Sequence, residues 1–209
     1  MPDYDGVQLC AVADNLGNMS CQWPFLDVNI FAEGQLGQID LVKAVELAVK
    51  GWNDICGLRL KHTTDKTKAH IVITRASLDG SGSVLADSQL PCGFTASQWN
   101  QLRQRYDTGE AWVISDNPPG NKIDAVRVIM HELGHAIGIG HINSGNLMAP
   151  TYSTQIRLPQ NGDIMEARAR YGKPVPVPTP PGVPPVVGDL SGEILVNGQK
   201  YTITGKRVG

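Results

Sequence analysis

Short runs of apolar residues recur along the first two thirds of the chain and predict the strands of a buried sheet. They lie at residues 26–31, 69–74, 83–86 and 111–115. The run at residues 69–74 is short and rich in β-branched side chains, which favour buried strands. The stretch between the last two runs, residues 95–106, is polar, and it is predicted only as helical or irregular.

Two other segments carry apolar residues at helical spacing. The first covers residues 40–53, and its apolar positions are Leu41, Val45, Ala48 and Trp52. The second covers residues 121–137, after a Pro-Pro-Gly break, and its apolar positions are Ile123, Val126, Met130, Leu133 and Ile137. Each pattern predicts a helix with one buried face.

The pattern changes after residue 172. Residues 173–188 are dominated by Pro, Val and Gly, a composition that favours an extended polyproline II spacer over a packed core. In residues 189–209, Asn197-Gly198 separates two strand-like runs and predicts a β-hairpin. A lone hairpin is marginal in water, so the tail either docks on something, frays, or is the remnant of a larger module.

Composition limits the classes of function. The chain has 209 residues, 41% of them hydrophobic, and a net charge of −2, which suits one compact domain with appendages. The absence of a basic cluster argues against a nucleic-acid surface, and no apolar run approaches the ~18 residues of a membrane span. Residues 1–5 carry neither a basic nor an apolar leader pattern, so export would require earlier removal of a leader or another route.

The four cysteines allow two disulfides in an oxidising compartment or four buried thiols. We expect the pairs Cys10–Cys21 and Cys56–Cys92, because the first would close a short N-terminal loop. Pro91-Cys92-Gly93 has a faint likeness to a peptide whose thiolate blocks a catalytic metal. Its position inside the main domain favours coincidence.

Residues 131–141 form the strongest chemical signal, H-E-x-x-H-x-x-G-x-x-H. Residues four apart on a helix share a face, so His131 and His135 can bind one metal ion. Gly138 lets the chain break and turn, because glycine adopts positive φ without steric cost. His141 then completes three imidazole ligands for one catalytic Zn²⁺ and leaves the fourth position open for water.

Glu132 lies beside the predicted metal, because it is rotated about 100° around the helix from His131. Its carboxylate can accept a proton from the bound water as a general base. Two plainer interpretations compete: an H-E-x-x-H sequence can be an ordinary exposed helix face, and Met148 can be core filler. Gly138 and His141 at the required spacing favour the metal site.

This motif, followed by Met148 within Asn-Leu-Met-Ala-Pro-Thr-Tyr at residues 146–152, resembles the metzincin zinc endopeptidases and, among them, the matrixins. Residues 44–76 resemble the matrixin first helix and second strand, and residues 158–172 resemble its final helix. The resemblance covers about residues 22–172. It implies an α/β (α+β) catalytic domain at residues 1–172, with a twisted mixed sheet of about five strands and three main helices.

The resemblance also implies roles for single residues. Pro150 and Tyr152 would line the main specificity pocket, and Arg127 would lie at its floor if its side chain points inward rather than to solvent. Met148 would form the Met-turn beneath the histidines, braced by Asp163. A substrate peptide would bind as an extended strand along an edge strand at residues 112–115.

Three positions depart from the matrixin pattern. Only His62 and His70 remain of the further histidines that a structural zinc would need, and Asp87 stands where a ligand histidine could be, so one zinc is predicted. Asp79-Gly80 can contribute to a Ca²⁺ loop or form a simple turn. Gly162 replaces an acidic residue that pairs with the freed N-terminus in matrixins, which argues against that style of activation.

Two functions fit these observations. The first is a zinc-dependent endopeptidase, extracellular or otherwise exported, that hydrolyses internal bonds of protein or peptide substrates. The second is a non-catalytic binding or assembly component that retains the metzincin fold and is anchored through residues 189–209. The retained Glu132 favours the enzyme, because a protein released from catalysis has little reason to keep a proton acceptor there.

Overall fold

The computed structural model of the protein describes residues 19–175 and the strand residues 190–196 and 199–205. The chain divides into two units, Met1–Pro174 and Val175–Gly209, and each is described by itself. Most of the predicted linker, Cys10 and the turn Asn197-Gly198 lie outside the described residues.

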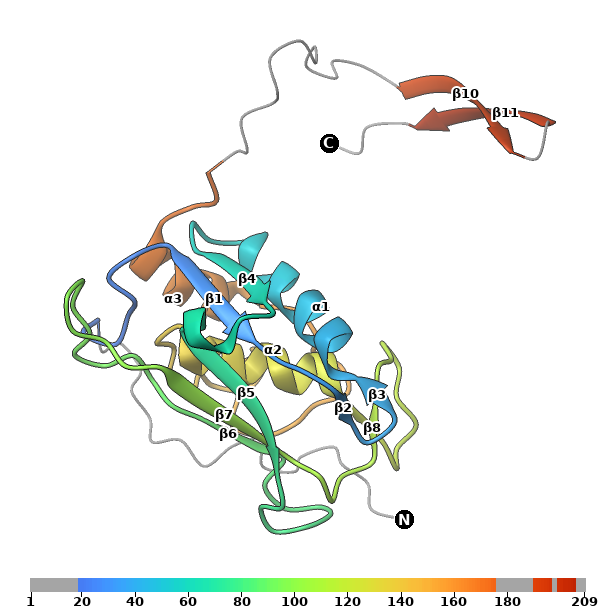
Figure 1. Cartoon of the computed structure of the whole chain (residues 1–209). Helices are drawn as coiled ribbons and strands as arrows, with labels where there is room; N and C mark the ends of the chain where they lie inside the picture. The colour runs from blue at the N-terminus through green and yellow to red at the C-terminus, as the bar shows by residue number, and fades with distance from the viewer. Residues whose placement is uncertain (1–18, 176–189, 197–198, 206–209) are drawn as a thin grey trace. The chain divides into compact units, whose positions relative to one another are not determined.

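A five-stranded sheet with the order β4-β1-β5-β7-β6 is the centre of the larger unit (Figure 1). Its strands are β1 (Asp27–Phe31), β4 (Arg59–Thr63), β5 (Ile71–Ala76), β6 (Ala86–Ser88) and β7 (Leu102–Asp107). Neighbouring strands run parallel except β6, which is antiparallel to β7 and forms one edge. The predicted mixed sheet of about five strands is confirmed.

Three α-helices accompany the sheet: α1 (Leu41–Asn53), α2 (Ala125–Ala136) and α3 (Asn161–Tyr171). A short 3-10 turn, η1 (Lys66–Lys68), follows β4. Aspartates begin the first two helices. Asp40 accepts from the amides of Val42 and Lys43, and Asp124 accepts from the amide of Val126, as expected for N-cap residues.

Helices α1 and α2 pack against each other, and Figure 1 shows α2 passing behind the strands of the sheet and α1 to the right of β4. A Cβ atom on Gly51 would lie 2.6 Å from the sulfur of Met130, so this glycine allows the close approach. The Trp52 indole N–H donates to the Met130 carbonyl at 2.8 Å. The helix that carries the metal-binding motif is thus fixed against the core along its length.

Two small ladders flank α1 and α2. β2 (Gln35–Leu36) pairs with β3 (Ile39–Asp40), and β8 (Trp112–Val113) pairs with β9 (Ile123–Asp124). Because β9 uses residues 123 and 124, α2 begins at Ala125 rather than at the predicted residue 121.

Two strands of the sheet were not predicted. β4 is short and carries Arg59, Lys61 and His62 among its five residues. β7 falls in the polar stretch predicted as helical or irregular. Its alternate residues Leu102, Gln104 and Tyr106 are buried. The side-chain NH₂ of Gln104 donates to the Ser88 hydroxyl, and the side-chain oxygen of Gln104 accepts from the Tyr106 hydroxyl. A polar residue thus occupies an inward position.

The strand at residues 112–115, predicted as the edge that binds substrate, is not part of the five-stranded sheet. Residues 112 and 113 form β8, whose pairing partner is β9 and which lies outside the five-stranded sheet. The indole of Trp112 is directed inward and donates to the Asp107 carbonyl at 2.7 Å. The edge strand next to α2 is β6, which begins where the predicted run at residues 83–86 ends.

The predicted cysteine pairs were also wrong. Cys21 is bonded to Cys92, and Cys56 is a buried thiol. Cys21 and Cys92 meet in an antiparallel bridge between two loops, a proximity created by the fold rather than by short separation in sequence. Cys56 follows α1, where burial raises the pKa of its thiol.

The smaller unit contains the predicted hairpin, made of β10 (Leu190–Val196) and β11 (Gln199–Gly205). The strands pair antiparallel from Leu190 opposite Gly205 to Val196 opposite Gln199. None of the helices in the described parts of the chain is both long enough and apolar enough to cross a bilayer.

Candidate metal centre

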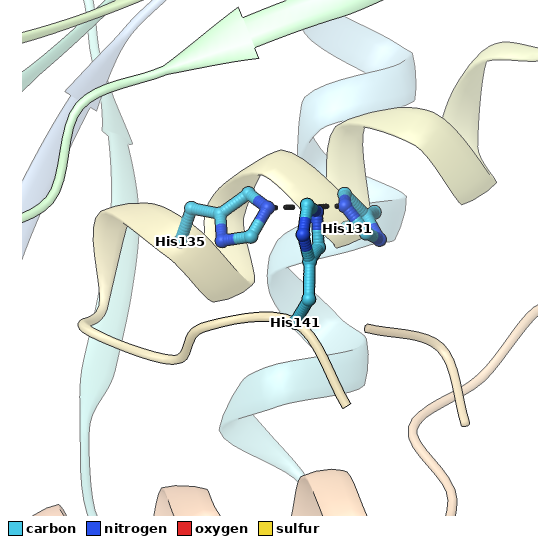
Figure 2. A group of neighbouring side chains, drawn as sticks. All are labelled: His131, His135 and His141. Carbon is cyan, nitrogen blue, oxygen red and sulfur yellow. Dashed lines mark hydrogen bonds between the residues drawn. The ribbon is translucent and has the colours of Figure 1, made fainter. Parts of the chain in front are cut away.

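Three imidazoles converge at the C-terminal end of α2 (Figure 2). His131 and His135 lie one turn apart on the helix and are fully buried, whereas His141 approaches from the segment after the helix and is half-buried. Ligand atoms of the three side chains all lie within 4.8 Å of one another. The structure thus brings together the three histidines that the sequence selects.

Backbone carbonyls orient the two helical rings. The Nδ1 atom of His131 lies 2.8 Å from the Leu147 carbonyl, and Nδ1 of His135 lies 2.7 Å from the Ile139 carbonyl. Because a carbonyl only accepts, each Nδ1 carries the proton and each Nε2 keeps its lone pair. This is the usual support of a metal-bound histidine.

Burial favours the neutral imidazole needed for metal binding. It lowers the pKa of His131 from 6.5 to about 3, against the opposing effect of the Leu147 carbonyl. The pKa of His135 is also well below its usual value, first because of burial and then because of the neighbouring histidines. Both rings are therefore available as ligands across the neutral pH range.

The spacing of the ring nitrogens fits Zn²⁺. The Nε2 atoms of His131 and His135 are 3.1 Å apart. Two nitrogens bound tetrahedrally at about 2.0–2.1 Å from one zinc ion would be separated by about 3.3 Å. Three neutral imidazoles that converge from one side are a ligand set typical of catalytic zinc, whereas structural sites use four protein ligands.

Gly138 makes the turn that brings His141 to the other two ligands. Its φ is +93°, and a Cβ atom there would lie 1.7 Å from the carbonyl oxygen of Cys21. The Gly138 amide donates to the His135 carbonyl, and the Ile139 amide donates to the Gly134 carbonyl. Only glycine satisfies both the positive φ and the contact with Cys21.

Glu132 is adjacent to the histidines and completely excluded from solvent. It follows His131 directly on α2, so its carboxylate projects from the helix about 100° away from that ligand. The one carboxylate of the helical motif is thus held in the interior beside the metal ligands.

Met148 and Asp163 support the site. The sulfur of Met148 occupies the space beside Gly134, where a Cβ atom would lie 2.2 Å from it. Asp163, in the first turn of α3, accepts from the amides of Leu147 and Met148 at 2.8 and 3.0 Å. The Leu147 carbonyl in turn orients His131, so Asp163 acts on the site through one intervening peptide.

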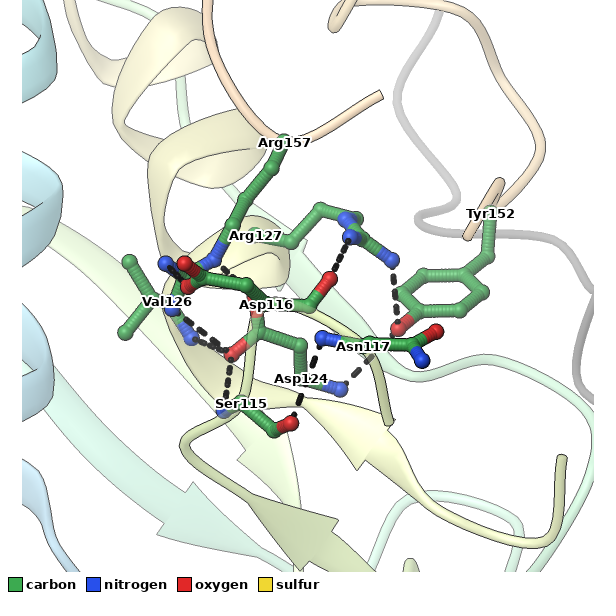
Figure 3. A network of polar contacts seen from close by, with 8 residues as sticks. All are labelled: Ser115, Asp116, Asn117, Asp124, Val126, Arg127, Tyr152 and Arg157. Atoms are coloured by element: carbon green, nitrogen blue, oxygen red, sulfur yellow. Dashed lines mark hydrogen bonds and ion pairs between the residues drawn. The ribbon is translucent and has the colours of Figure 1, made fainter. Parts of the chain in front are cut away.

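Arg127 points inward, which settles the two orientations that the sequence left open. Its side chain is 2% exposed, its guanidinium lies 5.2 Å from the centre of the Tyr152 ring, and Nη1 donates to the Tyr152 hydroxyl at 3.0 Å. The amide of Asp124 donates to the same hydroxyl. Arg127 and Tyr152 therefore form one buried unit at the first turn of α2 (Figure 3).

Pro150 is at the surface, whereas Tyr152 is buried. Pro150 is exposed and borders a cavity of about 390 Å³ together with His141, Ser144 and Thr151. The structure thus brings Pro150, but not Tyr152, to the open space beside the third histidine.

A charged cluster beside Arg127 was not predicted (Figure 3). Arg157 donates to the carboxylate of Asp124 at 2.6 Å and also pairs with Asp116. Asp124 is fully buried, and burial raises its pKa to about 6, although amide hydrogen bonds and the charge of Arg127 oppose this. No spacing rule connects these residues, which lie on three separate segments.

The residues predicted as possible ligands of calcium or a second zinc form contacts with other residues of the protein. Asp107 is buried and accepts from the amides of Asp79 and Gly80 at 3.0 and 2.9 Å, which agrees with a turn at Asp79-Gly80. Asp87 pairs with Arg105 on the neighbouring strand. Within the described ranges, the histidines of the motif are the only group of three or more His, Cys, Asp or Glu side chains close enough to hold one metal ion, and a Ca²⁺ site stays a prediction.

Comparison with known proteins agrees with this geometry. Matrix metalloproteinase-16 of Homo sapiens is 29% identical over 165 residues, covering 70% of this chain and 26% of that protein. The hatching enzyme of Paracentrotus lividus is 30% identical over 149 residues (66% and 23%), and metalloendoproteinase 1 of Glycine max is 28% identical over 147 residues (62% and 45%). The matched part spans less than half of each of these relatives.

A protein family also matches most of the chain. The family described as Matrixin matches residues 26–172, which include β1, the five-stranded sheet, all three α-helices and the histidine cluster. Zinc is the metal that this family implies. Because the matched residues make up more than half of the 209-residue chain, the chain belongs to the matrixin family.

Proposed function

We propose that the protein is an endopeptidase that hydrolyses internal peptide bonds with the help of one zinc ion bound by His131, His135 and His141. The observation that carries this proposal is the convergence of three imidazoles, two of them kept neutral by burial, beside a buried carboxylate. Membership in the matrixin family supports it.

The protein groups would divide the chemistry as follows. Bound zinc would supply a Lewis acid that polarises the scissile carbonyl and increases the acidity of water. Glu132 would accept a proton at its carboxylate as the water attacks the peptide carbon, and would then deliver that proton to the departing amine nitrogen. The carbonyls of Leu147 and Ile139 hold the helical imidazoles in the required tautomer.

Strand β6 is the best candidate for substrate binding. It has a sheet neighbour on one side only and packs against α2. An extended peptide can therefore add to its outer edge through backbone hydrogen bonds, a mode that selects for extended polypeptides without fixing their sequence.

The Arg127–Tyr152 unit would set the depth of the specificity pocket. A guanidinium packed on the Tyr152 ring fills the space between the first turn of α2 and the segment after Met148. A long substrate side chain would have to displace it, so side chains of medium length and apolar character should be preferred. Pro150 would line the outer wall, next to His141.

An exported location is part of the proposal. The Cys21–Cys92 disulfide is typical of proteins that reside in oxidising compartments. The tail that contains β10 and β11 would tether the enzyme to a larger assembly, since an isolated hairpin gains stability by docking.

Cleavage of a quenched-fluorescent peptide library by zinc-loaded protein tests the proposal. Glu132→Gln should keep one bound zinc and lower kcat by about 10²–10⁴-fold, the usual contribution of a general base. Glu46→Gln, an exposed glutamate on α1, is the matched control and should retain full activity. Zinc binding without cleavage by the wild type would instead support a binding or assembly component.

A further inference from the structure

Residues 21–23, here called the N-terminal bracket, contact the turn between the second and third histidines. The Trp23 indole N–H donates to the Ala136 carbonyl at 2.8 Å. The Trp23 amide donates to the Tyr171 hydroxyl at 3.0 Å, and that hydroxyl donates to the Ile137 carbonyl at 2.8 Å. Two consecutive carbonyls at the end of α2 are thus satisfied from distant parts of the chain.

Cys21 supports the next residue of the same turn. Its carbonyl oxygen lies directly against Gly138, where a Cβ atom would come within 1.7 Å. Arg170 donates to that same oxygen at 3.3 Å. The bracket therefore contacts residues 136, 137 and 138 in succession, and these three residues join His135 to the segment that carries His141.

A disulfide and an aromatic cluster hold the bracket in place. Cys21 is bonded to Cys92, 71 residues away. The Trp23 ring lies 5.1 Å from Phe94 and 5.9 Å from Trp99, both on the loop that follows Cys92. The Gly93 amide also donates to the Ser20 carbonyl, and the disulfide is the covalent part of the connection.

The bracket reaches the metal ligands through short links. The Gly138 amide donates to the His135 carbonyl, and the next residue, Ile139, accepts from Nδ1 of His135. His141 follows two residues later. A shift of the turn would therefore change both the ring orientation of His135 and the position of His141, which together supply two of the three ligands.

We propose that the N-terminal bracket and Tyr171 are positioning residues for the metal centre, and that reduction of the Cys21–Cys92 disulfide by a small thiol weakens zinc binding. This inference rests on the proposed zinc centre and adds a redox control to it. The bracket acts through the turn at residues 136–138 and does not contact the metal.

The redox step is an ordinary thiol–disulfide exchange. Cys92 is exposed and Cys21 is fully buried, so an external thiolate attacks the sulfur of Cys92 and forms a mixed disulfide while Cys21 leaves and takes up a proton. A second external thiol then resolves the mixed disulfide. The protein gains two electrons and two protons, and two external thiols become one disulfide.

Isosteric tyrosine variants of the full chain test the positioning role. Tyr171→Phe removes the hydroxyl that joins Trp23 to the Ile137 carbonyl. We expect about tenfold weaker zinc binding in a chelator competition assay, the lower end of the 10–100-fold effects of groups that orient metal ligands. Tyr106→Phe, which loses a buried hydroxyl bonded to Gln104, is the matched control and should bind zinc like the wild type.

A second experiment measures the zinc affinity of three forms: the oxidised wild type, the Cys21→Ser/Cys92→Ser double variant, and the wild type reduced by a phosphine. A phosphine is used as the reductant because added thiols would chelate zinc. Both altered forms should bind zinc about tenfold more weakly, and the serine variant should not respond to the phosphine. Cys56→Ala, which removes a buried thiol outside the disulfide, should respond to the phosphine as the wild type does.

Four results would overturn the inference. Equal zinc affinity of the oxidised and reduced wild type would remove the redox control, and equal losses in Tyr171→Phe and Tyr106→Phe would reduce the bracket to general stability. Amide hydrogen exchange should increase at residues 136–141 in the reduced form before the β-sheet amides are affected; uniform exchange would contradict a local effect. Failure of the oxidised protein to bind zinc would overturn the metal centre itself, and this inference with it.

Discussion

At the scale of single residues, the two helical histidines depend on burial as much as on their spacing. Each ring donates its Nδ1 proton to a carbonyl in the interior, so protonation of Nε2 would place an uncompensated charge in an apolar region. The two Nε2 atoms are therefore better placed to bind a metal cation than a proton. The same arrangement makes the zinc-free protein sensitive to acid.

The first prediction concerns this acid sensitivity. The pKa of His131 is about 3 in the folded protein, against 6.5 for the ordinary side chain. Between these values the unfolded chain holds more protons, so the free energy of unfolding should fall as the pH is lowered through this window. The contribution of one histidine is at most about 1.4 kcal/mol per pH unit.

Denaturant unfolding of chelator-treated protein between pH 4 and pH 7 measures this effect. His131→Gln should reduce the slope of the free energy of unfolding against pH by up to about 1.4 kcal/mol per pH unit. Parallel slopes for the wild type and His131→Gln would show that His131 is not buried in its neutral form.

The second prediction concerns Arg127. Arg127→Leu removes the guanidinium packed on Tyr152 and should open the specificity pocket. The ratio of kcat/KM for a long apolar side chain to that for a medium one, at the position after the scissile bond, should rise about tenfold, within the range of differences of one or two methylenes. Arg103→Leu, an exposed residue of β7, serves as the control. An unchanged ratio would exclude Arg127 from the pocket.

Contiguous residues were predictable at this scale, and distant ones were not. The three candidate zinc ligands lie within eleven residues, so helix geometry selects His131 and His135, and the turn at Gly138 adds His141. The Cys21–Cys92 bond and the contacts of Arg157 with Asp116 and Asp124 join segments that only the folded sheet and helices bring together. Their sequence spacing contains no information about contact.

At the scale of elements, the end of α2 shows how closely the turn is constrained. Gly138 and Gly145 both have φ near +90°, but only Gly138 contacts another segment, since nothing lies within 4 Å of a Cβ atom on Gly145. The pair therefore separates backbone strain from steric overlap.

The third prediction uses this pair. Gly145→Ala should lower the free energy of unfolding by about 1–2 kcal/mol, the strain of positive φ. Gly138→Ala should lose about 1–3 kcal/mol more from overlap with the Cys21 carbonyl and should also weaken zinc binding. Chemical denaturation and chelator competition measure the two effects. Equal losses in both variants would mean that the Cys21 contact relaxes without cost.

Elements with strong apolar periodicity were predicted, and elements stabilised by their neighbours were not. α1 buries one apolar face as predicted, whereas α2 is buried on all sides rather than on one face, and β5 begins with three buried residues. β4 and β7 carry charged residues on exposed positions and, in β7, a buried Gln104 that is satisfied by Ser88 and Tyr106. Buried and more exposed residues do alternate in β7, with Leu102, Gln104 and Tyr106 buried. Because Gln104 is polar, the alternation cannot be recognised from the hydrophobic pattern of the sequence.

At the scale of the whole molecule, an ion pair joins the two strands at the β6 edge of the sheet. Asp87 on β6 lies opposite Arg105 on β7, and their side chains pair in register. Asp87 is also the position where a further metal-ligating histidine was considered. A partly exposed ion pair contributes little stability, commonly below about 1 kcal/mol, so this edge holds mainly through its backbone ladder.

The fourth prediction is a zinc content of one ion per chain. His141→Ala should fall well below one ion after dialysis against a weak chelator, because two imidazoles bind zinc less tightly than three. Asp87→Asn should keep one ion, since its partner is Arg105. Elemental analysis of the dialysed proteins measures the zinc content per chain. A wild-type content near two ions would contradict the prediction.

The fifth prediction concerns the two units. A chain that ends at Pro174 retains the complete sheet, the three α-helices and the histidine cluster. Its melting temperature and kcat/KM toward short peptides should equal those of the full chain, because the hairpin contributes to neither. Association with a larger assembly should be lost, and size-exclusion chromatography in the presence of that assembly would detect it. Unchanged association would remove the tethering role.

The overall architecture followed from resemblance more than from periodicity. The motif at residues 131–141 implied a mixed sheet with three helices, and the structure has both. The identity of the edge strand did not follow, because strand order depends on pairing between distant segments. β6 has three residues, which are too few for an edge strand to be recognised from the sequence.

The supports of the metal centre come from opposite ends of the larger unit. Trp23 lies near its beginning, whereas Asp163 and Tyr171 belong to its last helix. A ribosome makes the ligands at residues 131–141 before it makes α3, so the growing chain holds its three histidines without their final supports. If the protein is the endopeptidase proposed above, hydrolytic competence would be delayed until α3 has been synthesised, and this delay would protect the nascent chain and its neighbours from premature cleavage.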